Sequence, residues 1–191
     1  MKFADYIPLA MRTCKELPHE EHLAHMAMGV TGEMGEIIDA LKKHYIYGKP
    51  LDQANLVEEL GDCCWYLAGL LQSVPEMCDK IEEHMADRHM SDTVLARYRS
   101  VTVRNILLLN AVVAKSAAKL VCPINTYIYW DAVQAILEAL LDTAQLLNID
   151  LEQALDINIQ KLAERYGDKY SDFKATNRDL DAERAILEGK A

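Results

Sequence analysis

Two short acidic segments stand out in the sequence, Glu33-Met34-Gly35-Glu36 and Glu58-Glu59-Leu60-Gly61-Asp62. Residues three positions apart share one face of an α-helix, so Glu33 and Glu36 point the same way, as do Glu59 and Asp62. Apolar residues flank both segments at helical spacing. A short connection makes two such helices antiparallel neighbours. The sequence therefore predicts four carboxylates that face one another between two packed helices.

Four partly buried carboxylates repel one another and cost stability unless a cation joins them. All-oxygen ligation favours Mg²⁺, for which Mn²⁺ can substitute, over zinc. Gly35 and Gly61 disfavour a helix, but their missing side chains would let a helix or a ligand come close. Two solvated acidic helix faces are the alternative. A di-iron bundle needs two Glu-x-x-His motifs, and the one present, Glu16-x-x-His19, is interrupted by Pro18.

The composition is helical, because Gly and Pro are scarce while Ala, Leu, Glu and Lys are abundant. Start and stop signals predict helices over residues 3–15, 20–45, 52–73, 75–89, 93–120, 130–147 and 151–166. A last helix is expected to be capped by Thr176-x-x-Asp179 and to end at Gly189. The predicted fold class is an all-α helical bundle, with the metal site between two antiparallel helices of a four-helix core.

Length and charge narrow the class of protein. A chain of 191 residues, 51% apolar and 26% charged, predicts a single domain over residues 1–191. The net charge of −10 argues against binding to nucleic acid or to an anionic membrane. The five cysteines follow no disulfide or zinc spacing. Because no signal peptide or membrane-spanning run is recognisable, we expect a cytoplasmic protein.

A weak internal similarity relates the two halves of the chain. The aligned segments are 59–71 with 135–147, and 31–36 with 113–118. Residues 93–147 can thus be read as a degenerate repeat, although unrelated amphipathic helices would align as well. A decayed copy predicts that its helices complete the four-helix bundle within one chain. It also predicts one active centre per chain, with Lys115 facing the site.

The acidic segments resemble those of the MazG-like all-α nucleoside triphosphate pyrophosphohydrolases. The resemblance covers about residues 20–72 and about 148–188, including Asn158–Tyr166 and the tail Asn177–Arg184, which is similar to phage and bacterial members. It implies the metal ligands Glu33, Glu36, Glu59 and Asp62. The part between these regions departs from short family members, which leaves the substrate and the subunit arrangement open. Larger relatives, the dimeric dUTPases, resemble a fused duplication.

The resemblance, helix spacing and the possible repeat together indicate residues that are expected to contact the substrate. Those expected at the phosphates are Lys161, Arg165, Asn158 and Lys42. Lys161 and Arg165 lie one helical turn apart, so both would reach the same anion; a solvated basic edge is the alternative. Those expected at the nucleotide are Tyr66, His25, Tyr166, Asn177 and Lys115. For His25, a satisfied position in the core is the alternative.

The implied reaction is Mg²⁺-dependent hydrolysis of (deoxy)nucleoside triphosphates to nucleoside monophosphate and pyrophosphate. Glu36, and after it Glu33, are the expected catalytic residues, which would take a proton from the attacking water. Two alternatives stay open. One is a substrate-dedicated enzyme, dUTPase-like or dGTP-selective, of phage nucleotide metabolism in the host cytoplasm. The other is a non-catalytic helical interaction protein. The expected partners are a nucleoside triphosphate and further copies of the chain, in a dimer or tetramer.

Overall fold

The structure is a computed structural model that describes residues 1–72, 74, 102–121 and 126–190. Its helices are α1 (Phe3–Met11), α2 (His19–Tyr47), α3 (Gln53–Gln72), α6 (Thr102–Leu120), α7 (Thr126–Leu147), α8 (Leu151–Tyr166), α9 (Asp172–Thr176) and α10 (Leu180–Leu187). No strand occurs in these ranges, so the predicted all-α class is confirmed. None of the helices described is both long and apolar enough to cross a bilayer.

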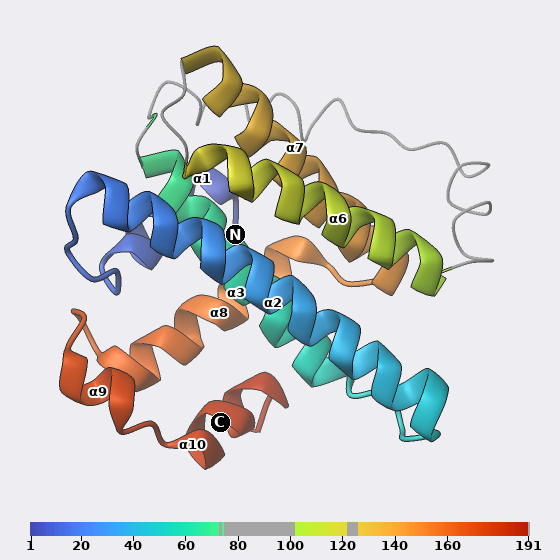
Figure 1. The fold of residues 1–191 in the computed structure, drawn as a ribbon. Helices are drawn as coiled ribbons and strands as arrows, with labels where there is room; N and C mark the ends of the chain where they lie inside the picture. Colours follow the sequence, from blue (N-terminus) through green and yellow to red (C-terminus); the bar gives the residue numbers. More distant parts are fainter. Residues whose placement is uncertain (73, 75–101, 122–125, 191) are drawn as a thin grey trace.

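Four helices form the core of the molecule. α2 packs against α3 and α6, and α7 packs against α3 and α6, so the four helices enclose one apolar interior. Met34, Leu60 and Ile136 come from three of them and are completely buried. Figure 1 shows α6 and α7 on one side of α2 and α3, with α8 and α10 on the other. The packing agrees with a four-helix core built within one chain, whereas the common origin of its halves stays a prediction.

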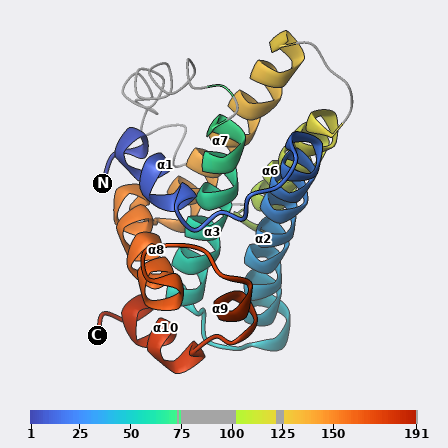
Figure 2. The same cartoon turned by 90° about the vertical axis from the view of Figure 1, so that its left-hand side faces the viewer.

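A second layer covers the other side of α3. α1 and α8 both pack on α3 and on each other, and α10 packs on α8 and α3. Figure 2 shows α3 between this layer and the pair formed by α2 and α6. The N-terminal amine of Met1 donates to Oδ2 of Asp156 at 2.8 Å, which ties the start of the chain to α8. α3 is thus the helix on which both layers meet, and it carries Glu59 and Asp62.

The helix ends agree with the sequence signals in most places, with differences at the start of α10, the end of α1 and the start of α7. Asp150 and Asp179 cap α8 and α10 because their side chains accept from backbone amides three residues on. Thr176 is the last residue of the short helix α9, so the expected capping box is wrong and Asp179 caps alone. α1 ends at Met11, four residues before the prediction, where the hydroxyl of Thr13 donates to the carbonyl of Ala10.

The remaining helix predictions fall around the undescribed segments. α7 begins four residues earlier than the predicted start at residue 130. The helix predicted over 93–120 is described from Thr102, as α6. The helix predicted over 75–89 lies outside the described residues.

Candidate functional site

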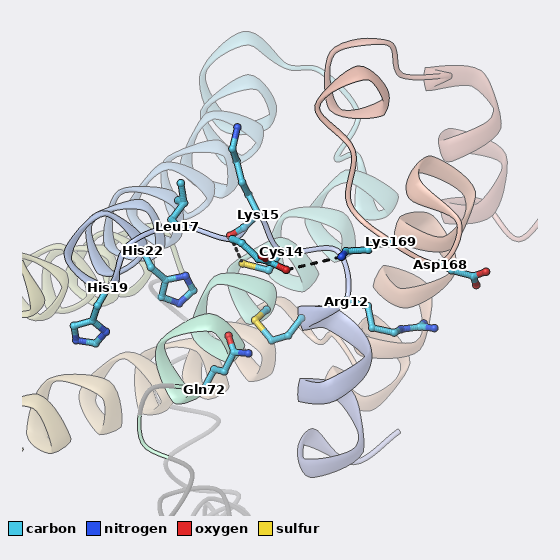
Figure 3. A pocket seen from close by; sticks show the side chains of 11 residues that line it. Arg12, Cys14, Lys15, Leu17, His19, His22, Gln72, Asp168 and Lys169 are labelled. Carbon is cyan, nitrogen blue, oxygen red and sulfur yellow. Dashed lines mark hydrogen bonds and ion pairs between the residues drawn. The ribbon is translucent and has the colours of Figure 1, made fainter.

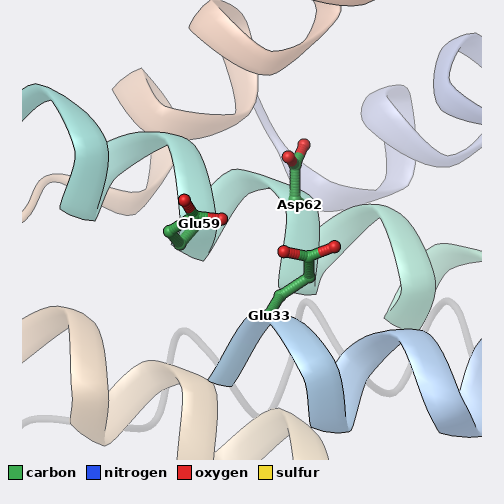
Figure 4. A group of neighbouring side chains, drawn as sticks. All are labelled: Glu33, Glu59 and Asp62. Carbon is green, nitrogen blue, oxygen red and sulfur yellow. The ribbon is translucent and has the colours of Figure 1, made fainter. Parts of the chain in front are cut away.

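Three of the four predicted metal ligands lie together. Glu33 on α2 and Glu59 and Asp62 on α3 each offer a carboxylate oxygen, and these oxygens all lie within 4.8 Å of one another. Figure 4 shows Glu33 extending from α2 toward the two acids of α3. Glu36, one turn further along α2, is exposed and stands outside this group. We call Glu33, Glu59 and Asp62 the carboxylate cluster.

The negative charges of the carboxylate cluster are only partly compensated by positive groups. Burial raises the pKa of Glu59 to about 8, and its hydrogen bond to Glu33 and the charge of Asp62 act in the same direction. The pKa of Glu33 is also raised, first by burial and then by Asp62. Three half-buried carboxylates with only oxygen donors fit a hard divalent cation, which would relieve this repulsion. The cluster could therefore hold such an ion.

A buried lysine partly neutralises one member of the cluster. The side chain of Lys161 on α8 is 1% exposed, and its ammonium group lies 2.6 and 2.7 Å from the two carboxylate oxygens of Asp62. The same ammonium donates to Oε1 of Glu58 at 3.2 Å. An unpaired ammonium at this depth would be strongly unfavourable, so the pairing explains how Lys161 can be buried. The structure thus pairs Lys161, predicted at phosphate, with Asp62 and Glu58.

Asp62 is held from a second direction by an amide. The side-chain amide of Asn158 donates to Oδ1 of Asp62 at 2.7 Å, and its oxygen accepts from the hydroxyl of Tyr6 at 2.7 Å. This chain of bonds requires α8 to approach α3 closely at Gly61. A Cβ atom on Gly61 would lie 3.1 Å from Cβ of Asn158 and 3.3 Å from the carbonyl of Ala154. Asn158, predicted at phosphate, is in this structure a support of Asp62.

The carboxylate cluster opens into a cavity of about 780 Å³. Eight of the predicted site residues line it: Glu33, Glu36, Glu59, Asp62, Arg165, Tyr66, His25 and Tyr166. The other predicted residues do not line it. Lys42 pairs with Asp39 on the exposed side of α2, Lys115 is exposed on α6, and Asn177 donates to the carbonyl of Phe173. No described residue of α6 or α7 contributes to the cavity wall.

Aromatic rings form one wall of the cavity. His25 lies edge-on to Tyr66, with ring centroids 5.6 Å apart, and Trp65 meets Tyr66 at 5.0 Å. The Trp65 indole donates to the hydroxyl of Thr13 at 3.0 Å, which fixes the ring. Burial and the neighbouring His22 lower the pKa of His25, so its neutral form is favoured. Flat, partly apolar walls of this kind suit a planar ring.

Two arginines at the cavity share a buried acid. Arg165 on α8 donates to both oxygens of Glu183 on α10, through Nε at 2.8 Å and Nη2 at 2.6 Å. Arg178, just before α10, does the same at 3.3 and 2.5 Å. Both arginines line the cavity. The cavity wall therefore bears both carboxylates and guanidinium groups.

The motifs in the sequence missed several residues of this site. Glu58, Trp65, Tyr170 and Arg178 line the cavity, and Tyr6 supports it from behind. Glu58 and Trp65 adjoin predicted residues on the helix predicted over 52–73, so that helix already indicated their position near the site. The roles of the other three depend on contacts between segments far apart in sequence, and no spacing rule reports those.

A second cavity of about 700 Å³ lies where α1 ends and α2 begins (Figure 3). Cys14, His22 and Gln72 are among the residues that line it. Its two acidic wall residues are Glu16, whose side chain is 93% exposed and which pairs with Lys169 at 3.8 Å, and Asp168. The imidazole of His22 is 2.9 Å from the carbonyl of Gly69. With no group of buried acids, this cavity lacks the features of the first.

An all-α bundle with clustered acids and arginines around one cavity is suited to an enzyme that binds an anion through a metal ion. Residues 21–91 match the family model of the MazG nucleotide pyrophosphohydrolase domain. Over that segment the chain is MazG-like, as the sequence motifs predicted, and the match supports nucleotide pyrophosphohydrolase activity. It includes the whole carboxylate cluster and Glu36, while Lys161 and Arg165 lie beyond it. No curated protein and no solved structure matched the chain.

Proposed function

We propose that the protein hydrolyses (deoxy)nucleoside triphosphates to the monophosphate and pyrophosphate, with Mg²⁺ as cofactor and Mn²⁺ as a substitute. One observation carries the proposal: the carboxylate cluster, within the MazG match, opens into the same cavity as Arg165. Acids alone would repel a triphosphate, and arginines alone would bind it without activating water. Because both kinds of group line one cavity, they support a substrate held between a metal ion and a guanidinium group.

The side chains of the cavity divide the work. Glu33, Glu59 and Asp62 are the side chains that would hold the divalent cation, which when bound lowers the pKa of a water ligand and offsets phosphate charge. Glu36 lines the cavity but stands outside the cluster, so its carboxylate is available to take a proton from the attacking water. Attack of the water at the α-phosphorus, which would release pyrophosphate, is part of this proposal, and the family match supports it.

The basic side chains have different roles in this proposal. Arg165 reaches the cavity and offers forked N–H donors that suit phosphate oxygens. Lys161 orients Asp62 from below and would contact phosphate only after exchanging this partner. Lys42 stays a predicted phosphate contact, although it pairs with Asp39 in this structure.

For the nucleoside end, the aromatic wall is the natural position. Tyr66 and His25, both predicted contacts, lie there beside Trp65. Tyr166 lines the same cavity next to Tyr170, with ring centroids 5.5 Å apart. These rings would bind the faces of a base, and stacking contributes about 1–3 kcal/mol per base. Stacking alone discriminates weakly among bases, because every base has a π-face.

Pyrophosphate release from the eight common nucleoside triphosphates, with Mg²⁺ and with EDTA, tests the proposal. We expect release only with the metal, and a monophosphate as the second product. Orthophosphate as the first product, or full activity in EDTA, would contradict it. The ratios of kcat/KM separate a broad enzyme from one dedicated to dUTP or dGTP. Absence of hydrolysis of all eight would favour a non-catalytic helical protein.

We further propose that the protein acts in the cytoplasm as a dimer or tetramer.

A further inference from the structure

The carboxylate of Glu183 is buried to an extent unusual for an acid on a short terminal helix. Glu183 is 2% exposed, while every other residue of α10 is exposed or half-buried. Burying a single charge without a partner costs several kcal/mol. Glu183 has two partners, since Arg165 and Arg178 each donate to both of its oxygens. A buried acid held by two arginines points to a purpose beyond neutralisation.

The charge of this triad is not balanced. Two guanidinium groups and one carboxylate leave a net charge of +1, and one arginine would have been enough to neutralise Glu183. An arginine has five N–H donors, and the bonds to Glu183 use two from each. The side chains of Arg165 and Arg178 are 13% and 38% exposed and both line the cavity. The excess positive charge therefore faces the cavity that holds the carboxylate cluster.

Contacts other than those of Arg178 also attach α10 to the rest of the molecule. Arg184, on the same helix, donates to Asp52 at 3.0 Å and to Glu188 at 2.7 Å. Asp179 caps the helix, and Arg165 alone would pair Glu183 with α8. A clamp for α10 would therefore be complete without a second arginine on Glu183. Arg178 instead adds a fixed guanidinium at the cavity.

From this geometry we propose that Arg178 is a second polyphosphate-binding residue, and that Glu183 is the positioning residue that holds both guanidinium groups toward the cavity. This inference rests on the proposed function, because it names the part of the cavity that receives the phosphate chain. A guanidinium fixed by a buried carboxylate loses little conformational entropy when it binds an anion. Two such groups, from α8 and from the segment before α10, would hold different oxygens of one polyphosphate.

Binding of inorganic tripolyphosphate in the presence of Mg²⁺, measured by calorimetry, tests the inference on four proteins. These are the wild type, Arg178→Ala, Glu183→Gln and the matched control Arg184→Ala, whose side chain lies on α10 but does not line the cavity. We expect Arg178→Ala to raise Kd about tenfold or more, the value of a charge-assisted hydrogen bond. Arg184→Ala should leave Kd unchanged.

Glu183→Gln separates positioning from simple electrostatics. Removing a negative charge near an anion site should tighten binding if charge alone mattered. A positioning role predicts the opposite: Kd for tripolyphosphate, and KM for the nucleotide, should rise about tenfold because the guanidinium groups lose their anchor. Melting curves establish that the variant is folded at the assay temperature. If Glu183→Gln is unfolded, Arg178→Lys decides, because lysine keeps the charge without the forked donors. The Kd of Arg178→Lys for tripolyphosphate should be at least about tenfold higher than that of the wild type.

The outcomes have distinct meanings. Wild-type affinity in Arg178→Ala overturns the role of Arg178, and equal or tighter binding in folded Glu183→Gln overturns the role of Glu183. If either of these results is found and the wild type still hydrolyses nucleotides, the proposed function stays intact. A wild type that binds tripolyphosphate but releases no pyrophosphate from any nucleotide refutes the proposed function alone, and the Kd ratios still decide the inference. A wild type that does not bind tripolyphosphate refutes the inference.

Discussion

Two acids one helical turn apart on α3 have opposite surroundings. Asp62 accepts three hydrogen bonds, two from Lys161 and one from Asn158. Glu59 has another acid, Glu33, as its hydrogen-bond partner, and burial and this contact raise its pKa to about 8. The charge of Asp62 is therefore compensated by other side chains of the protein, whereas Glu59 needs a proton or a cation.

Without metal, Glu59→Gln should stabilise the protein. An acid whose folded-state pKa is raised from 4.5 to about 8 binds an extra proton in the folded state, so stability falls as pH rises through that range. The Gln amide can donate to Glu33 as the protonated acid does, and it has no charge to bury. In EDTA at pH 7.5 we expect the free energy of unfolding to increase by about 2 kcal/mol, measured in urea. Wild type and variant should converge near pH 4.5; a constant difference would contradict this account.

Asp62→Asn should have the opposite effect on stability. From the sequence motifs alone, Asp62→Asn would be expected to relieve repulsion among acids and so to stabilise the protein. The structure shows that it would leave the ammonium of Lys161, 1% exposed, with Glu58 as its remaining acidic partner. Breaking a buried ion pair costs about 3–5 kcal/mol. We expect a loss of that order in EDTA and no hydrolysis, while Glu59→Gln should lose hydrolysis without losing stability. Equal stability of the two variants would contradict the different surroundings assigned to Asp62 and Glu59.

The sequence predicts which acids lie together better than it predicts the residues that support them. Glu33, Glu59 and Asp62 could be predicted because three-residue spacing on a helix fixes which acids share a face. Glu183, which comes 124 residues after Glu59 in the numbering, carries no such local signal. Its role depends on how α10 docks on α8, and that packing is a property of the folded chain.

Among the elements, α3 depends most on close packing, and Gly61 is where this can be tested. An added Cβ would press on Asn158 and on the backbone of Ala154, neither of which can move without shifting α8. Gly61→Ala should therefore destabilise the protein and lower kcat, because Asn158 would move away from Asp62. A Cβ added to Gly35, in the facing acidic segment, would meet no atom of another element within 4 Å. Gly35→Ala should stabilise by about 1 kcal/mol through helix propensity.

Thermal melts and the pyrophosphate assay compare the two alanine variants. A Gly61→Ala protein as stable and as active as wild type would show that α8 can retreat from α3 at no cost. Such a result would remove the argument that the close approach positions Asp62.

The stability that Glu183 contributes by docking α10 should decrease at acid pH. Burial alone would raise the pKa of Glu183, but Arg165 and Arg178 lower it to about 2. An acid with a depressed folded-state pKa stabilises the fold fully above its unfolded value near 4.5 and less as pH falls toward 2. The stability difference between wild type and Glu183→Gln should be about 3 kcal/mol at pH 6 and shrink below pH 4.5. Urea unfolding from pH 6 to pH 3 measures it; a difference independent of pH would contradict the pairing.

Most helices were predictable, and the exceptions have physical causes. α8 agrees at both ends, because Asp150 provides a clear cap and Gly167 follows the last turn. α9 has only five residues, too few for a periodic pattern, and it is held in part by its cap Ser171. α1 stops early because Thr13 turns back to the carbonyl of Ala10, a local bond that competes with the helix.

Considered as a whole, the molecule assembles its cavity from distant parts of one chain. α2 and α3 bring the carboxylate cluster, α8 brings Arg165, and the segment before α10 brings Arg178. α6 and α7 complete the core on the far side and add nothing to the cavity wall in the described ranges. The second helix pair thus acts as a scaffold for the first.

Each chain should carry one nucleotide site. If residues 93–147 are a decayed copy, Lys115, Ala118 and Ala135 stand where the first half has acids, and Glu138 alone keeps a carboxylate. In the described part of the chain, the carboxylate cluster is the one group of acids placed to hold a cation, and Glu138 accepts from Gln134 instead. One acid is too few for a site that needs several oxygen ligands.

Titration of the protein with a non-hydrolysable nucleoside triphosphate analogue and saturating Mg²⁺ should therefore give a stoichiometry of about one per chain, whatever the oligomeric state. Asp62→Asn should abolish this binding, whereas Glu138→Gln should leave it at the wild-type value. Two nucleotides per chain, or loss of binding in Glu138→Gln, would mean that the second half keeps a working site. Half-site stoichiometry would instead mean that subunits complete or block one another's cavities.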